Sequence, residues 1–203
     1  QCGGVVGFLK SLMWAVDTIF PKKVVILFES GGSQRKRAIF PDYKMHRKPM
    51  KLNRFYEDDI PDTEDNKLAQ VISLLKITKK LPVCQLYVEN AEADDVIAYL
   101  AKYKFANDNK VIMSSDHDFY QLLDDKTRMY LSHKRSFVTA AHALKETGVH
   151  PNNFCVARTF AGDKSDNIPG VKGAGLKTLA NRFPMLASEQ SVSVDDIIKE
   201  SET

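Results

Sequence analysis

The sequence has little cysteine and no long hydrophobic run. Its three cysteines, Cys2, Cys84 and Cys155, are odd in number, far apart and form no CxxC pair, which argues against a disulfide framework and a zinc site. No apolar stretch approaches the ~18 residues that a membrane-spanning helix needs, and no signal peptide is visible. We therefore expect an intracellular, cytoplasmic protein with reduced thiols and no membrane partner.

The chain also lacks a strong net charge. Its 29 Lys and Arg residues are nearly balanced by 26 Asp and Glu residues, which gives a net charge of +3. The distribution is more informative than the total. Residues 21–54 hold ten Lys and Arg but only two acids, and an acidic cluster follows at 57–59. A basic segment close to acidic motifs is typical of a protein that binds nucleic acid.

With 203 residues, of which 43% are hydrophobic, the chain can bury a sizeable core. Short apolar runs rich in β-branched residues alternate with segments of helical periodicity, which predicts an α/β fold with a parallel central sheet flanked by helices. The pattern of the last third of the chain predicts a helical subdomain. The predicted strands are 24–28, 86–88, 111–113 and 127–131, and the predicted helices are 5–18, 67–79, 93–103, 140–147, 151–160, 175–182 and 194–200.

Acidic side chains follow the predicted strands. They form four groups, which are Glu29; Glu92, Asp94 and Asp95; Asp116 and Asp118; and Asp163 and Asp166. The first three groups lie where parallel strands end, so folding would gather them at one edge of the sheet. Clustered carboxylates repel one another unless cations neutralise them, and their hard oxygen atoms suit Mg²⁺ or Mn²⁺. The alternative is that these acids only cap helices.

Three motifs then resemble the flap endonuclease and 5′–3′ exonuclease family, which includes phage 5′ nucleases and the 5′-nuclease domain of bacterial DNA polymerase I. Residues 92–95 read EADD, residues 115–118 read SDHD, and residues 162–175 read GDKSDNIPGVKGAG. The third motif is long and specific. The resemblance covers about residues 5 to 183, and it favours a bacterial or phage source.

The resemblance implies a PIN-like α/β nuclease core over residues 1–135, with a helical arch at about 44–66 that we expect to be mobile without DNA. It implies a helical subdomain over 136–203, with a helix–three-turn–helix DNA-binding element at about 160–183. Two Mg²⁺ or Mn²⁺ ions, about 4 Å apart, would be held by six aspartates, with Glu92 helping and Glu29 acting through water. The six are Asp94, Asp95, Asp116, Asp118, Asp163 and Asp166.

The resemblance also assigns DNA contacts. Residues 41–47, PDYKMHR, resemble the family's P-x-YK-x-x-R segment, by which Lys44 and Arg47 would stabilise the reacting phosphate. From their chemistry alone, Arg35 and Arg37 could hold a neighbouring phosphate, and Tyr43 could either stack on a base or pack internally. The glycine-rich turn would approach duplex DNA closely and hold a K⁺ ion through its carbonyl groups. Its contributing residues are Gly170, Lys172, Gly173, Gly175 and Lys177.

The implied activity is that of a monomeric hydrolase that cuts 5′ flaps, branched or nicked duplexes and RNA-primed ends during replication or repair. Two departures keep an alternative open. The family's first aspartate is not present, and we expect it to lie before Gln1; Glu29 stands where relatives often have aspartate. The alternatives are a catalytically impaired protein that binds branched DNA and a PIN-type RNA nuclease, although the latter should lack the glycine-rich turn.

Overall fold

The computed structural model describes residues 3–29, 33–46 and 64–202. These residues form two compact units, which are described separately below. The first contains residues 3–29 and 64–93, and the second contains residues 33–46 and 94–202. Among the described residues, no helix is both long enough and apolar enough to cross a bilayer.

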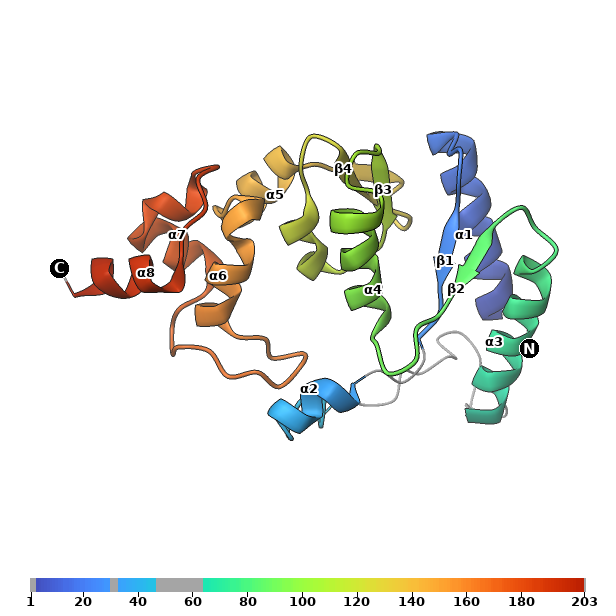
Figure 1. The fold of residues 1–203 in the computed structure, drawn as a ribbon, viewed down its shortest axis with the longest axis horizontal. Helices are drawn as coiled ribbons and strands as arrows, with labels where there is room; N and C mark the ends of the chain where they lie inside the picture. The colour runs from blue at the N-terminus through green and yellow to red at the C-terminus, as the bar shows by residue number, and fades with distance from the viewer. Residues whose placement is uncertain (1–2, 30–32, 47–63, 203) are drawn as a thin grey trace. The chain divides into compact units, whose positions relative to one another are not determined.

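The first unit pairs two helices with a two-stranded parallel sheet (Figure 1). Its elements are α1 (Gly3–Ile19), β1 (Val25–Leu27), α3 (Glu64–Thr78) and β2 (Cys84–Leu86). Val25 lies opposite Cys84, and Leu27 opposite Leu86. The two helices are tied together near the start of α1, where the Gly4 N–H donates to Gln70 Oε1 at 2.8 Å.

The second unit is built on a three-stranded sheet in the order β3-β4-β5. β3 (Lys110–Met113) and β4 (Thr127–Leu131) are parallel, and β5 (Ser136–Val138) is antiparallel to β4. The same unit contains α2 (Gln34–Ile39), α4 (Ala93–Tyr99), the π-helix η1 (Leu100–Lys104) and the 3₁₀-helix η2 (His117–Leu122). The C-terminal part contains α5 (Ala140–Thr147), α6 (Pro151–Ala161), α7 (Leu176–Arg182), η3 (Pro184–Ala187) and α8 (Val194–Ser201).

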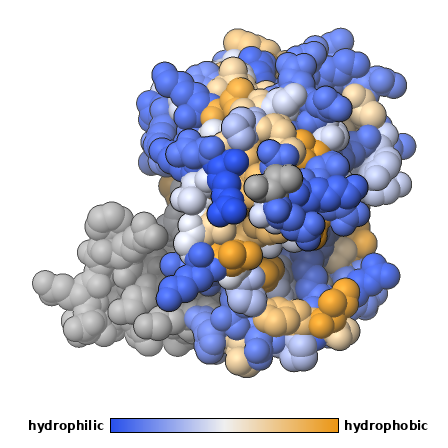
Figure 2. Space-filling model, turned by 90° about the vertical axis from the view of Figure 1, so that its left-hand side faces the viewer, coloured by the Kyte–Doolittle hydropathy of each residue, from blue (hydrophilic) through white to orange (hydrophobic). Residues whose placement is uncertain are grey.

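One hydrophobic core runs through the second unit. It joins Ile112 and Met129 of the sheet to Phe154, Leu179 and Ile197 of the C-terminal helices. Met129 of the central strand β4 is fully buried, because it belongs to this core. The outer face of the C-terminal helices is mostly hydrophilic, with only scattered hydrophobic residues (Figure 2). These helices therefore depend on the sheet for their buried side.

The predicted α/β class and parallel strand pairing are confirmed, with three corrections. The second strand is Cys84–Leu86 rather than 86–88, and the helix predicted over 93–103 becomes a π-helix after Tyr99. The antiparallel strand β5 was not predicted, since three residues are too few for a clear alternation. The predicted arch lies mostly outside the described residues, and the predicted boundary between residues 135 and 136 stays a prediction.

A buried asparagine holds the chain that follows η3. The side chain of Asn153 is fully buried, and its Nδ2 donates to the carbonyl groups of Ser188 at 2.8 Å and Gln190 at 3.0 Å. Its Oδ1 accepts a hydrogen bond from the Val192 N–H at 2.8 Å. A buried amide that satisfies several backbone groups at once is costly to remove, because those groups then lose their partners inside the protein.

Asn153→Ala should therefore lower the free energy of unfolding by about 3 kcal/mol. The neighbouring Asn152 is the matched control, because its side chain makes a single exposed hydrogen bond, to the Glu189 carbonyl at 2.7 Å. Asn152→Ala should cost less than about 1 kcal/mol. Urea denaturation of the two variants measures both values, and equal losses would contradict a special role for Asn153.

Candidate metal and nucleic-acid site

Asp116 and Asp118 lie in the turn that follows β3, as the sequence predicted. Asp116 is the N-cap of η2, and its Oδ1 accepts a hydrogen bond from the Asp118 N–H at 3.0 Å. The opposite side of η2 buries Phe119, Tyr120 and Leu122 in the core. This burial fixes the turn, so both carboxylates are held at the carboxyl end of β3.

Asp163 and Asp166 belong to a loop that closes on itself after α6. The backbones of Asp163 and Ile168 exchange two hydrogen bonds, of 2.8 and 2.7 Å. Within the loop, Asp163 Oδ1 accepts hydrogen bonds from the Ser165 N–H and hydroxyl, both at 2.7 Å, and from the Asp166 N–H at 3.3 Å. These bonds hold the Asp163 carboxylate in one orientation.

Two glycines make this loop possible. Gly162 has a φ of 70°, in the left-handed region, and a side chain there would meet the Gly170 backbone and the Ile168 carbonyl. A side chain at Gly170 would in turn collide with the Ala161 carbonyl. The sequence assigned Gly170 to close approach of DNA. In the structure, its missing side chain already accommodates a close approach of the protein's own backbone.

Arg158, which the sequence analysis did not single out, connects the two acidic pairs. Its Nη2 donates to Asp118 Oδ1 at 3.1 Å and also to Asp163 Oδ2. Its Nη1 donates to the Gly162 carbonyl at 3.1 Å. A basic residue 40 positions from Asp118 along the chain carries no local sequence signal, so only the folded structure identifies this contact.

The charges of these residues act on one another. Partial burial raises the pKa of Asp118, Arg158 opposes the rise, and the carboxylates of Asp116, Asp163 and Asp166 add to it, so that the pKa lies above its ordinary value. At Asp163, burial also favours the neutral form, but the Ser165 hydrogen bonds and Arg158 outweigh it and hold the pKa below its ordinary value. The carboxylates of Asp116, Asp163 and Asp166 are therefore close enough to Asp118 to interact with it electrostatically, and we call these four residues the aspartates of the shared field.

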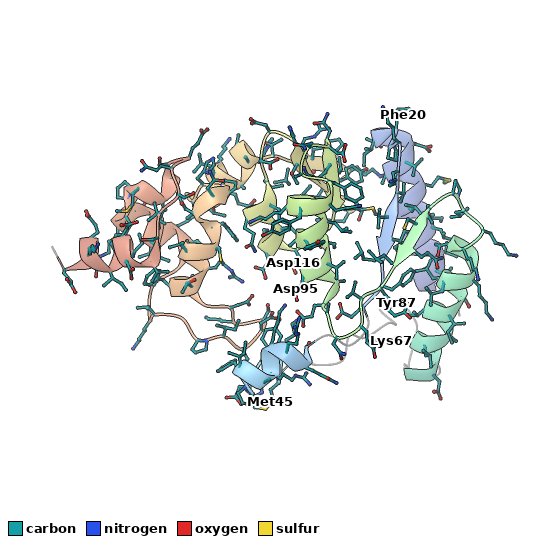
Figure 3. The ribbon with its side chains drawn as sticks, in the orientation of Figure 1. Phe20, Met45, Lys67, Tyr87, Asp95 and Asp116 are labelled. Atoms are coloured by element: carbon teal, nitrogen blue, oxygen red, sulfur yellow. The ribbon has the colours of Figure 1, made fainter. Side chains whose placement is uncertain are left out.

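Asp94 and Asp95 occupy the first turn of α4, where the helix dipole favours negative charge. Asp95 Oδ2 pairs with Lys36 Nζ of α2 at 3.0 Å, and about half of the Asp95 side chain is exposed. Figure 3 labels Asp95 at the start of α4 and Asp116 beyond the end of β3. One of the predicted metal ligands, Asp95, is thus ion-paired with a lysine of the basic segment.

The two predicted glutamate ligands belong to the first unit. Glu29 Oε2 accepts a hydrogen bond from the Ala93 N–H at 3.1 Å, at the first residue of α4. This is the capping role that was the alternative to metal binding. Glu92 is buried, with 2% of its surface exposed. The structure therefore assigns six of the predicted ligands to the second unit and two to the first.

Over residues 3–29, 33–46 and 64–202, no three His, Cys, Asp or Glu side chains are arranged to hold a metal ion. Within the second unit, the six predicted aspartates are therefore not brought together as such a group. Their chemistry nevertheless fits a divalent cation, because all donors are carboxylate oxygens, which suit Mg²⁺ and Mn²⁺. Burial is the largest cause of the raised pKa of Asp118, and the neighbouring carboxylates of Asp116, Asp163 and Asp166 add to it.

Two residues of the basic segment, Asp42 and Lys44, form hydrogen bonds with the Asp163–Ile168 loop. The Lys44 N–H donates to the Asp166 carbonyl at 2.9 Å, and Asn167 Nδ2 donates to the Asp42 carbonyl at 3.0 Å. Lys44 has a φ of 58°, and its Nζ lies 4.9 Å from the ring centroid of Tyr43. Lys44 is therefore held beside the acidic residues. Arg47 lies outside the described residues.

Tyr43 is buried, with 5% of its surface exposed, so of the two roles considered the structure has packing rather than base stacking. Arg37 Nε donates to the Tyr43 carbonyl at 3.3 Å and so helps to hold the turn. Arg35, which lies two residues before Arg37 on α2, is exposed.

The remaining glycine-rich turn is open to solvent. Gly173 has a φ of 82°, Gly175 is the N-cap of α7, and a side chain at either position would meet no atom within 4 Å. Lys172 and Lys177 flank this turn and are exposed. The turn therefore presents accessible backbone with a lysine on each side.

Comparison with known proteins supports the resemblance seen in the motifs. A family model described as the 5'-3' exonuclease, N-terminal resolvase-like domain, matches residues 1–148. A 5'-3' exonuclease of Bacillus subtilis (strain 168) is 35% identical over 182 residues, which cover 86% of this chain and 56% of that protein. A 5'-3' exonuclease of Buchnera aphidicola subsp. Schizaphis graminum (strain Sg) is 31% identical over 178 residues, 87% of this chain and 58% of that protein. The chain thus spans somewhat more than half the length of these relatives.

Solved structures agree in fold. The T5 D15 protein co-crystallised with metal ions superposes with a TM-score of 0.71 at 20% identity, over 99% of this chain and 78% of that one. The bacteriophage T5 D15 flap endonuclease in a pseudo-enzyme–product complex with DNA and metal ions gives 0.65 at 21%, over 98% and 75%. At this identity the likeness shows the fold alone. Since the family model covers well over half of the sequence, the chain belongs to the 5'-3' exonuclease family, of which it contains the N-terminal resolvase-like domain.

Proposed function

We propose that this protein is a structure-specific 5′ nuclease that hydrolyses phosphodiester bonds in branched DNA. The observation that carries the proposal is the group of four aspartates with a shared field, Asp116, Asp118, Asp163 and Asp166, with Lys44 attached to the same loop. The names of its relatives agree, since they are 5'-3' exonucleases and a flap endonuclease crystallised with DNA and metal ions.

The eight predicted acids would together bind two divalent ions, either Mg²⁺ or Mn²⁺. Asp94, Asp95 and the four aspartates of the shared field are the ligands, and Glu92 and Glu29 assist. When bound, the ions lower the pKa of the attacking water and stabilise the leaving oxygen. The Asp163 carboxylate is well suited to the ligand role, because three hydrogen bonds hold its other oxygen in place.

The basic residues act on the substrate. Lys44 and Arg47 stabilise the charge that develops on the reacting phosphate, and the exposed Arg35 contacts a neighbouring phosphate, with Arg37 holding the turn beside it. Gly173 and Gly175 offer open backbone to the duplex, between Lys172 and Lys177. We assign this turn to a helix–three-turn–helix element at about 160–183, which also binds K⁺ through carbonyl groups.

The proposed substrates are 5′ flaps, nicked or branched duplexes and RNA-primed ends, acted on by a monomer in the cytoplasm during replication or repair. The chain is organised as a nuclease core over 1–135, with an arch at about 44–66, and a helical subdomain over 136–203. One competing function has an observation in its favour. A DNA-binding protein with impaired catalysis would fit the ligands that are not assembled and the Glu29 carboxylate that caps α4.

Cleavage of a labelled 5′-flap duplex distinguishes these two functions. With Mg²⁺ we expect a product cut near the junction, and with excess chelator we expect binding without cleavage, because the carboxylates alone cannot activate water. A duplex without a flap serves as the control. Flap binding with no cleavage at any Mg²⁺ or Mn²⁺ concentration would favour the impaired alternative.

Asp116→Asn should reduce cleavage at least about 100-fold, because it removes a charged ligand while preserving the shape of the side chain and the η2 cap. DNA binding should change little. Asp125→Asn is the control, since Asp125 is an exposed aspartate between η2 and β4. If Asp116→Asn cleaves as well as Asp125→Asn does, Asp116 is not a metal ligand.

Lys172→Ala should weaken binding to every duplex tested and reduce the slope of log affinity against log salt by about 0.9, the value for one lost phosphate contact on B-DNA. Lys145→Ala on α5 removes an exposed lysine outside the turn and should leave the slope unchanged. Fluorescence anisotropy over a range of KCl concentrations measures both slopes. An unchanged slope for Lys172→Ala would exclude this lysine from the contacts.

A further inference from the structure

The guanidinium of Arg158 lies where two predicted metal ligands converge. A single nitrogen atom, Nη2, serves both Asp118 Oδ1, at 3.1 Å, and Asp163 Oδ2. The side chains of Arg158, Asp118 and Asp163 are 30%, 44% and 15% exposed, so the group is partly shielded from water. The second guanidinium nitrogen, Nη1, is occupied by the Gly162 carbonyl. The Arg158 guanidinium is therefore a cation of the protein itself, bound by one carboxylate from residues 115–118 and one from residues 162–175.

The scaffold holds the guanidinium in that position. Arg158 lies in the last turn of α6, whose buried residues Phe154 and Ala157 are fixed in the core. The helix ends where the Gly162 N–H donates to the Arg158 carbonyl at 2.8 Å. The same Gly162 accepts from the Arg158 side chain, so both ends of the arginine are tied to the start of the Asp163 loop.

We propose that Arg158 is a resident counter-cation that competes with a divalent ion for the carboxylates of Asp118 and Asp163. It is a positioning residue, and this inference rests on the proposed function, in which those two aspartates hold metal. With Arg158 on the carboxylates, the repulsion among the four aspartates is offset and the loop is kept folded. A divalent ion that takes the same oxygens displaces the guanidinium from them.

The competition has a defined thermodynamic consequence. Any interaction that stabilises only the protein without metal lowers metal affinity by the same factor, because both are parts of one binding cycle. Removing Arg158 should therefore tighten metal binding. A residue with a merely structural role would behave differently, since its loss would destabilise the protein equally with and without metal.

The test compares Arg158→Met with the unaltered protein, with Mn²⁺ alone as the probe. Methionine keeps much of the apolar stem and removes the charge. Titration followed by the electron paramagnetic resonance of free Mn²⁺ should show a dissociation constant about three- to tenfold lower for the variant, the range expected for a partly exposed ion pair with hydrogen bonds. In parallel, the Tm of the variant should fall in chelator and recover towards that of the unaltered protein in saturating Mg²⁺.

Lys145→Met is the matched control, because it removes one exposed positive charge from α5 and should leave Mn²⁺ affinity unchanged. Arg158→Lys is the second variant, for use if Arg158→Met does not fold. A single ammonium group cannot reproduce the forked contacts with Gly162 and both aspartates, so this variant should also bind Mn²⁺ more tightly than the unaltered protein.

Two negative outcomes can be told apart. If the unaltered protein binds Mn²⁺ and neither Arg158 variant binds it more tightly, the counter-cation role is wrong and the proposed function stands. The same conclusion follows if Arg158→Met loses equal Tm in chelator and in Mg²⁺. If the unaltered protein binds no Mn²⁺, the assignment of the aspartates as metal ligands fails, and the inference fails with it.

Discussion

The closeness of the Asp116, Asp118, Asp163 and Asp166 carboxylates is the constraint around which the proposed site is built. Neighbouring carboxylates favour protonation or a nearby cation; at Asp118, burial raises the pKa most and the other three carboxylates add to the rise. Arg158 supplies one such cation within the protein. The negative charge of these carboxylates is what would make the site attractive to a divalent metal ion.

The surrounding structure serves to keep these charges in place. A single core from Ile112 of β3 to Ile197 of α8 fixes both the turn after β3 and the end of α6. Gly162 and Gly170 then let the Asp163 loop fold tightly against the end of α6. The Lys44 N–H joins the basic segment to the Asp166 carbonyl of this loop. Hydrogen bonds thereby hold acidic and basic residues from three segments close together, as a site that acts on phosphate would require.

Much of the fold could be predicted because the relevant signals are local. Helix α5 begins and ends where its periodicity predicts, and β3 and β4 lie within one residue of their predicted positions. The prediction was less accurate for β2, and β5 was missed, since strands of three residues carry little pattern. Asn153 and Arg158 were missed for another reason. Asn153 binds Ser188, 35 residues away, and Arg158 binds Asp118, 40 residues away along the chain.

The sequence by itself determined the family and the α/β class, because the run from Gly162 to Gly175 and the acids after the strands are patterns of neighbouring residues. The tertiary structure alone showed that Tyr43 is buried, that Gly170 receives backbone rather than open solvent, and that Arg158 pairs with two aspartates. These outcomes depend on how the chain folds back on itself, over both short and long separations in sequence. Packing brings charges into contact across many residues, and no local pattern records that.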